Sequence, residues 1–290
     1  MKTIGIFTTK GGSGKTTCTF NIAGVLAKEY GKKVLLIDGD PSSNLTQCCL
    51  AAAIEETGSA DFLNNEVCIE DLFFFPEKVN DSIQNVKFSL ISNTQPKKRG
   101  IDIIPTRNID IHPKRRLKNS NDALSSGAFE SGQIKNALSM IKRTGNHRYD
   151  YDFCLIDFEG ASELDNKSTE FLLACDYVLI PATIDSFSAS QTAAVKVHID
   201  KVNDEYGTNI QVIGVFGAST DNSSVYDEQM LDVYRSALGK DFLDVSIRRS
   251  KEAVWSTQRG IPVIYYKKTH PLTNDFKKLT EEMLKRIGEL

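Results

Sequence analysis

Residues 8–17 read T-T-K-G-G-S-G-K-T-T, from Thr8 to Thr17. The apolar run that precedes them, Lys2–Phe7, predicts a buried strand. After them, apolar side chains recur at helical spacing as far as Tyr30, and Gly31 is a typical C-terminal stop for a helix. A strand, a glycine-rich loop and a helix in this order are the context of a phosphate-binding loop.

This loop supplies the groups that hold the phosphates of a nucleotide. Glycines let successive backbone N–H groups turn inward without a Cβ clash, and the positive end of the following helix faces the same anion. Lys15 adds a point charge at the β- and γ-phosphates, and the Thr16 hydroxyl is a ligand for Mg²⁺. The alternative is a glycine-rich turn with two solvated lysines, and the flanking strand and helix argue against it. The predicted nucleotide-binding residues are Lys10, Gly11, Gly12, Ser13, Gly14, Lys15, Thr16 and Thr17.

The loop departs from the plain motif G-x-x-x-x-G-K-[ST], because Thr9 stands where the first glycine belongs and a second lysine, Lys10, follows it. The sequence K-G-G-S-G-K-T resembles the deviant Walker A motif of the ParA/MinD family of ATPases. The resemblance implies a P-loop NTPase fold with ATP and Mg²⁺ as cofactors. It also implies that Lys10 reaches across a homodimer to the nucleotide of the partner.

Two aspartates follow a second predicted strand, Lys33–Ile37, in the stretch D-G-D-P-S-S-N from Asp38 to Asn44. Ligands of α/β sheets bind beyond the carboxyl ends of the strands, which favours a site here, although Asp and Gly are also common in ordinary turns. The stretch resembles the family's D-x-D-P-Q-G-N, with Ser42 and Ser43 in place of Gln and Gly. The resemblance implies that Asp40 positions the attacking water and helps to hold the Mg²⁺ shell. The candidate catalytic residues are therefore Lys10, Lys15 and Asp40.

A third acidic residue, Asp157, ends the apolar run Phe153–Asp157 in a Walker B pattern. It suits a water-mediated contact with Mg²⁺, because Mg²⁺ keeps several of its waters. The candidate metal residues are Thr16, Asp40 and Asp157. The family continues with Pro-Pro, whereas this chain has Phe158-Glu159-Gly160, which resembles the D-x-x-G switch of GTPases. Glu159 is either a carboxylate near the phosphates or a solvated loop acid.

Further strands and helices alternate along the chain, which predicts an α/β fold with a doubly wound, mostly parallel twisted sheet. The predicted strands span residues 101–106, 177–183 and 210–216, and the predicted helices span 134–141, 186–205, 225–238 and 274–287. We expect a single domain over residues 1–290, with a mobile loop around 113–132 where Lys, Arg, Ser, Asn and Gly dominate.

The C-terminal third holds a basic cluster. Residues 246–250, S-I-R-R-S, and 259–265, R-G-I-P-V-I-Y, resemble the family's I-P-R loop and its later G-x-P-V. In ParA-like proteins this region contributes to adenine packing and to non-specific DNA binding, so the candidate DNA-binding residues are Arg248, Arg249, Lys251 and Arg259. A solvated rim is the alternative interpretation. The apolar stripe of the last helix predicts core packing rather than the basic amphipathic helix of a membrane-bound MinD-like protein, because Glu281, Glu282 and Glu289 dilute its bases.

Composition narrows the class of protein. The net charge of −3 argues against a wholesale polyanion binder but allows a local basic patch. The six cysteines form no C-x-x-C pair, which indicates reduced, buried thiols in a cytoplasmic protein. We expect no signal peptide and no membrane span, because no apolar run approaches the roughly 18 residues that a span needs. The chain begins at the first strand, so we also expect no N-terminal DNA-binding extension.

The hypothesis that follows is a ParA-like ATPase that serves plasmid or chromosome partition. The resemblance implies an ATP-dependent sandwich dimer that binds DNA non-specifically, associates with the nucleoid, and is released when a centromere-binding, ParB-like partner stimulates slow hydrolysis. Two alternatives stay open: a MinD-like or other positioning ATPase with a non-DNA cargo, and a nucleotide-regulated scaffold with little turnover.

Overall fold

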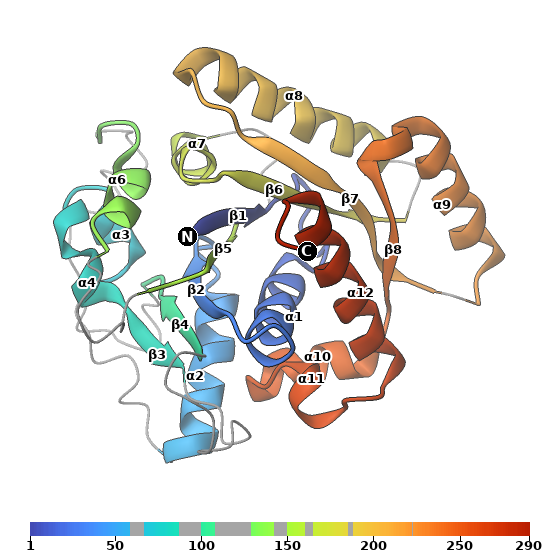
Figure 1. Ribbon diagram of the computed structural model, residues 1–290, viewed down its shortest axis with the longest axis horizontal. Coiled ribbons are helices and arrows are strands. Elements are labelled where there is room, and N and C mark those ends of the chain that lie inside the picture. Colours follow the sequence, from blue (N-terminus) through green and yellow to red (C-terminus); the bar gives the residue numbers. More distant parts are fainter. Residues whose placement is uncertain are drawn as a thin grey trace.

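The computed structural model describes residues 1–58, 67–86, 100–107, 129–141, 150–159, 165–184, 188–221 and 223–290. Within them a single sheet of eight strands runs through the molecule (Figure 1). The strands are β1 (Lys2–Ile6), β2 (Lys33–Asp38), β3 (Gln84–Val86), β4 (Gly100–Ile104), β5 (Phe153–Asp157), β6 (Tyr177–Thr183), β7 (Gln211–Thr220) and β8 (Phe242–Arg248).

The strand order is β3-β4-β2-β5-β1-β6-β7-β8. β3 pairs antiparallel with β4, and every other neighbouring pair is parallel. The predicted doubly wound α/β fold is therefore confirmed. β1 lies between β5 and β6, with β2 on the far side of β5, so the carboxyl ends of these four strands meet at one edge of the sheet.

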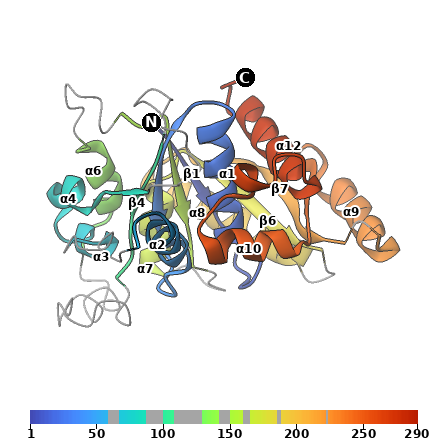
Figure 2. The same cartoon turned by 90° about the horizontal axis from the view of Figure 1, so that it is seen from below.

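Helices cover both faces of the sheet. They are α1 (Lys15–Lys28), α2 (Asn44–Thr57), α3 (Ile69–Leu72), α4 (Val79–Ser82), α6 (Gln133–Ser139), α7 (Asn166–Leu173), α8 (Ser188–Tyr206), α9 (Val225–Leu238), α10 (Lys251–Arg259), α11 (Val263–Tyr266) and α12 (Pro271–Arg286). In Figure 1, α7 and α8 lie above the sheet, while α1, α10, α11 and α12 lie below it. Figure 2, seen from below, places α1, α2, α10 and α12 in front of the strands.

β2 shows why this sequence needs two covering layers. All six of its residues are buried. Val34 and Leu36 enter the hydrophobic cluster shared with α1, α2, α11 and α12, whereas Leu35 and Ile37 enter the cluster shared with α3, α6, α7 and α8. A continuous apolar run of this kind is typical of a parallel strand that is buried on both faces.

The element boundaries differ from the predicted ones where local signals were weak. The prediction of a loop over residues 246–250 is wrong for its first part, because β8 extends to Arg248. Two residues of this strand, Leu243 and Ile247, are buried. The last helix begins three residues early, because His270 caps it and Pro271 suits its first position. The predicted loop at 113–132 lies outside the described residues as far as residue 128, and Gly160 also lies outside them.

Other expectations of the sequence are met. All six cysteines are buried and unbridged. The stripe of α12 packs into the core through Phe276, Leu279 and Met283, although Leu290 beyond the helix is exposed. Among the described residues, no helix is both long and apolar enough to cross a bilayer.

Candidate functional site

The glycine-rich loop connects β1 to α1 at the edge of the sheet where the four strand ends meet. Gly12 and Gly14 have φ angles of 71° and 80°, a left-handed conformation that glycine adopts without strain. Gly14 is the N-cap of α1, and the described first turn of this helix has neither a side-chain cap nor an acidic residue. The Ser13 hydroxyl is buried without a hydrogen-bond partner among the described residues. The loop therefore presents free donors to an anion, as a triphosphate requires.

Lys15 lies inside the site. Its side chain is buried, and Nζ donates a hydrogen bond to the carbonyl of Lys10 at 3.2 Å. Burial lowers the pKa of the Lys15 ammonium, and the carboxylates of Asp157, Asp40 and Glu159 act in the opposite direction. A cation held in this way is placed to neutralise a phosphate.

The Thr16 hydroxyl and Asp157 meet directly. Thr16 Oγ1 donates to Asp157 Oδ2 at 2.6 Å, and Asp157 Oδ1 is buried without a partner among the described residues. Burial raises the pKa of the Asp157 carboxyl well above its ordinary value, with a smaller contribution from Asp38 in the same direction. A hydroxyl and an unsatisfied carboxylate oxygen side by side fit Mg²⁺ with its water shell, because Mg²⁺ prefers oxygen ligands.

The loop after β2 carries the two aspartates in different environments. Asp38 is fully buried, and burial raises the pKa of its carboxyl to about 7, against the effect of hydrogen bonds from Thr46 and from the backbone of Asp40. Asp40 is half-buried, and its Oδ1 accepts from the backbone and hydroxyl of Ser42 at 2.8 and 2.6 Å. Ser43, which stands where the resembling family has Gly, has a φ of 61°. The position thus has the left-handed backbone that favours glycine.

Lys10 lies at the mouth of the loop. Its Nζ donates to Thr183 Oγ1 at the end of β6, at 3.1 Å. The two lysines of the motif are therefore placed differently: Lys15 points into the acidic interior, and Lys10 lies over the end of the neighbouring strand.

Phe158 and Glu159, which stand where the family has Pro-Pro, have different surroundings. Phe158 is fully buried against Phe7, with 5.0 Å between ring centroids, and its ring lies so close to Gly5 that a Cβ there would come within 2.6 Å. Glu159 is half-buried and lines the nucleotide cavity, and burial raises the pKa of its carboxyl. The interpretation of Glu159 as a carboxylate near the phosphates therefore agrees with its position.

Residues 11–17 of the loop line a cavity of about 920 Å³, and Lys10 is not among its lining residues. Asp40 and Glu159 form one part of its wall, and α2 and α10 form another. These two helices contribute lining residues that were not predicted, namely Asn44, Gln47, Cys48, Leu50, Ala51 and Ile54 from α2, and Thr257 and Gln258 from α10. The apolar spacing of Leu45, Cys48, Cys49 and Ala52 after a polar S-S-N run was a signal for α2.

The predicted DNA-binding residues divide into two groups. Arg248 forms an ion pair with Asp275 of α12, with Nε 2.6 Å from Oδ2 and Nη2 2.8 Å from Oδ1. Arg249, Lys251 and Arg259 are exposed at the start and end of α10. The structure therefore gives Arg248 a partner within the fold and leaves the other three side chains at the surface.

Comparison with known proteins agrees with this geometry. A family model described as an AAA domain matches residues 1–212. The virulence plasmid ParA family protein pGP5-D of Chlamydia psittaci is 24% identical over 287 residues, which cover 99% of this chain and 96% of that protein. The chromosome partitioning protein ParA of Caulobacter vibrioides is 24% identical over 286 residues, with 99% and 95% covered. The structure of the septum site-determining protein MinD of Pyrococcus horikoshii, complexed with Mg-ADP, has a TM-score of 0.69 at 22% identity and covers 99% of this chain and 97% of that one.

One of these relatives is named for chromosome partitioning and one for septum-site determination, and related solved structures contain an ATP analogue or ADP with magnesium. The family match covers well over half of the chain, and the second lysine of the phosphate-binding loop accompanies it. The chain therefore belongs to the AAA-domain family and is a deviant Walker A ATPase of the ParA/MinD type.

Proposed function

We propose that this protein is an ATP-driven partition switch. With ATP bound, two copies pair as a sandwich dimer that binds DNA non-specifically. Hydrolysis, stimulated by a centromere-binding, ParB-like protein, separates the copies and releases the DNA. The names of the plasmid and chromosome relatives support this reading over other uses of the fold.

The observation that carries the proposal is the unequal placement of the two lysines. Lys15 is enclosed among carboxylates and serves the nucleotide of its own chain. Lys10 lies at the mouth of the same loop, with its ammonium on Thr183. A second cation at the mouth has a purpose if it neutralises a phosphate held by the facing copy.

The residues of the chain divide the work of hydrolysis. The loop amides and Lys15 bind the phosphates, while Thr16 and Asp157 would hold Mg²⁺, which would neutralise part of the phosphate charge. Asp40 accepts a hydrogen bond from the attacking water and orients it. Catalysis of this kind consists of positioning and electrostatic stabilisation.

DNA binding is assigned to the exposed cations Arg249, Lys251 and Arg259. The chain as a whole has a net charge of −3, so only a local patch can attract phosphates. Three such residues in each of two copies offer six phosphate contacts, which predicts a slope of about −5 when log K is plotted against log salt concentration. A single copy offers half as many contacts, so binding should require ATP.

Filter binding of duplex DNA between about 50 and 200 mM salt, with and without ATP, tests the proposal. Arg249→Ala should weaken binding equally on all sequences and reduce the magnitude of the slope by about 2 per dimer. Lys15→Ala, which cannot hold the nucleotide, should abolish the effect of ATP, and Asp40→Ala should bind DNA with ATP but fail to hydrolyse it. If the ATP-bound protein has no affinity for DNA at low salt, the partition proposal is wrong. The positioning ATPase with a non-DNA cargo then takes its place, a reading that the fold shared with MinD supports.

A further inference from the structure

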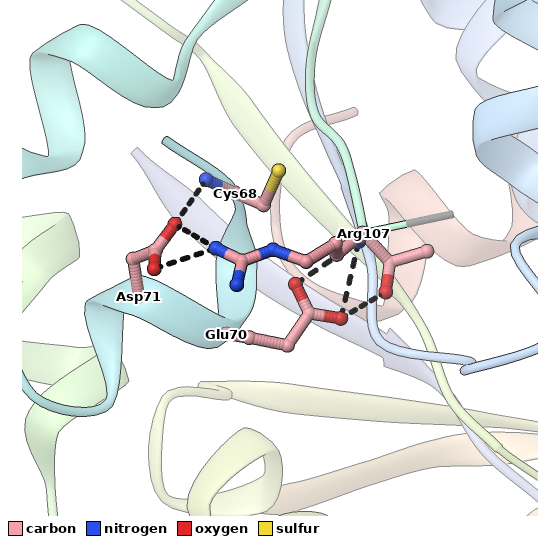
Figure 3. A network of polar contacts seen from close by, with 5 residues as sticks. Cys68, Glu70, Asp71 and Arg107 are labelled. Carbon is pink, nitrogen blue, oxygen red and sulfur yellow. Dashed lines mark hydrogen bonds and ion pairs between the residues drawn. The ribbon is translucent and has the colours of Figure 1, made fainter. Parts of the chain in front are cut away.

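A buried polar cluster lies around Arg107, outside the nucleotide cavity (Figure 3). The side chain of Arg107 is only 7% exposed, and its Nη2 donates to both carboxylate oxygens of Asp71, at 2.7 and 2.8 Å. Asp71 also accepts from the backbone of Cys68 at 2.8 Å. Its neighbour in α3, Glu70, accepts from the backbone N–H of Arg107 at 3.0 Å and from the hydroxyl of Thr106. The segment that follows β4 is thus held against α3 by two carboxylates.

Hydrogen bonds connect this cluster to the loop that follows β2 and carries Asp38 and Asp40. The backbone N–H of Thr106 donates to Thr46 Oγ1 at 3.1 Å. The Thr46 hydroxyl in turn donates to Asp38 Oδ2 at 2.7 Å, and the backbone N–H of Thr46 donates to the same oxygen at 2.8 Å. The other oxygen of Asp38 accepts from the backbone N–H of Asp40 at 3.2 Å. A line of hydrogen bonds therefore runs from Glu70 through Thr106, Thr46 and Asp38 to the backbone of Asp40.

The donor and the acceptor of each hydrogen bond in this line are fixed. A hydroxyl has one proton to donate, and the carboxylates of Asp38 and Glu70 at the two ends take the protons of Thr46 and Thr106. The hydroxyl oxygen of Thr46 then accepts a hydrogen bond from the backbone N–H of Thr106. Thr46, Thr106 and Glu70 are at most 5% exposed, so water does not replace a bond that is lost.

The line also reaches the wall of the nucleotide cavity. Thr46 lies in the first turn of α2, which supplies cavity-lining residues from Asn44 to Ile54. Thr46, Thr106 and Glu70 themselves do not line the cavity. They touch the loop and the helix that do, so any effect they have on hydrolysis is indirect.

We propose that Thr46, Thr106 and Glu70 are positioning residues for the Asp38–Asp40 loop. They hold the backbone of Asp40 at the orientation from which its carboxylate acts on the attacking water. The inference rests on the proposed function, because it assumes that Asp40 takes part in hydrolysis. Hydrogen bonds between buried groups restrict their movement, and a small displacement of a catalytic group costs a large factor in rate.

Thr106 gives the cleanest test, because it lies two hydrogen bonds away from Asp38. Thr106→Val keeps the shape of the side chain and the backbone N–H that donates to Thr46, but it removes the hydroxyl that donates to Glu70 and so loosens the segment that carries this N–H. Thr106→Ser keeps the hydroxyl. Thr280→Val is the matched control, because Thr280 is also buried and, among the described residues, its hydroxyl bonds only within α12, donating to the carbonyl of Phe276 at 2.8 Å. We expect kcat for ATP to fall by about 10- to 100-fold in Thr106→Val, with KM within about twofold, and to recover in Thr106→Ser. Thr280→Val should keep the wild-type kcat even if it lowers the melting temperature.

A second measurement does not depend on turnover. Hydrogen exchange of the nucleotide-free protein reports on the amides of Asp40 and Thr46, both of which donate to Asp38. In Thr106→Val these amides should exchange about tenfold faster or more, while the amides of α12 keep their rates. Thr46→Val should show the same pattern more strongly, and Thr46→Ser should resemble the wild type.

The outcomes separate the two proposals. If the wild type hydrolyses ATP and Thr106→Val has the same kcat, the positioning role is refuted. It is equally refuted if Thr106→Ser loses as much kcat as Thr106→Val, or if Thr280→Val loses as much. If the wild type has no turnover at all, the proposed function falls, and unchanged exchange at Asp40 and Thr46 would then refute the positioning role on its own.

Discussion

Replacing Asp38 by asparagine should change the free energy of unfolding of the nucleotide-free protein in a pH-dependent way. The difference between the variant and the wild type should shift in favour of the variant between pH 5 and pH 8. The side chain of Asp38 is fully buried, and burial raises the pKa of its carboxyl from an ordinary value of 3.8 to about 7. The folded state therefore binds a proton that the unfolded chain has already lost. Stability contributed by this group is fully present below pH 3.8 and is lost as the pH rises through 7.

The size of the effect follows from the two pKa values. The full loss of stability above pH 7 is about 4 kcal/mol, and the part that falls between pH 5 and pH 8 is about 2 to 3 kcal/mol. Asparagine does not ionise, so this loss is absent from the variant. In the wild type, the backbone nitrogen of Asp40 lies 3.2 Å from Asp38 Oδ1. The amide group of asparagine places a second donor opposite this N–H, which lowers the stability of the variant by the same amount at every pH. Asp157 lies opposite Asp38 on the neighbouring strand, and Asp38 contributes to raising its pKa. Removing the Asp38 carboxylate therefore also brings the pKa of Asp157 closer to its ordinary value, which again favours the variant at high pH.

Urea denaturation of both proteins at pH 5, 6, 7 and 8, in the presence of EDTA, measures the difference in the free energy of unfolding at each pH. We expect the difference to shift toward the variant by about 2 to 3 kcal/mol from pH 5 to pH 8. Asp200→Asn is the control for the chemical change itself, because Asp200 is exposed on α8. A difference between Asp38→Asn and the wild type that stays constant across this range would refute the reasoning.

Three further substitutions test other parts of the molecule. Lys10→Ala should retain ATP affinity in calorimetry and lose the ATP-dependent dimer in light scattering, and a normal dimer would contradict the role given to Lys10. Arg248→Ala should lower the free energy of unfolding by about 1 to 3 kcal/mol, because it leaves the buried carboxylate of Asp275 without its ion pair; a neutral effect in urea denaturation would show that the pair contributes nothing. Gly24→Ala should destabilise the protein by about 1 to 3 kcal/mol despite the higher helix propensity of alanine, because the new Cβ would come within 2.3 Å of Pro262, and a raised melting temperature would contradict this.

Local signals were enough to predict where the candidate residues next to strands lie. The phosphate-binding loop, Asp38 and Asp157 each follow an apolar run, and the strand pairing brings them together as expected. These features depend on residues that are close in sequence. Their geometry follows from the rule that ligands bind at the carboxyl ends of parallel strands.

The parts that the sequence did not predict depend on distant contacts. The start of α2 is held by Asp38, which lies outside the helix, and Ser43 before it has the left-handed conformation that sequence rules expect of glycine. Arg248 was interpreted as a DNA contact, but α12 brings Asp275 to it from 27 residues away in the sequence. No pattern in the residues around Arg248 indicates that partner.

The position of β1 in the sheet has a consequence for how the protein is made. The nucleotide loop directly follows β1, yet Lys2 pairs with Phe153 and Ile4 pairs with Tyr177, so both neighbours of this strand are synthesised long after it. At about 5–20 residues per second, the ribosome needs roughly 7–30 s to reach the first of them. During that interval the first apolar strand has no partner on either edge. A chaperone that binds exposed apolar segments should therefore capture nascent chains that contain β1 but lack β5 and β6, and release chains in which both have left the ribosome.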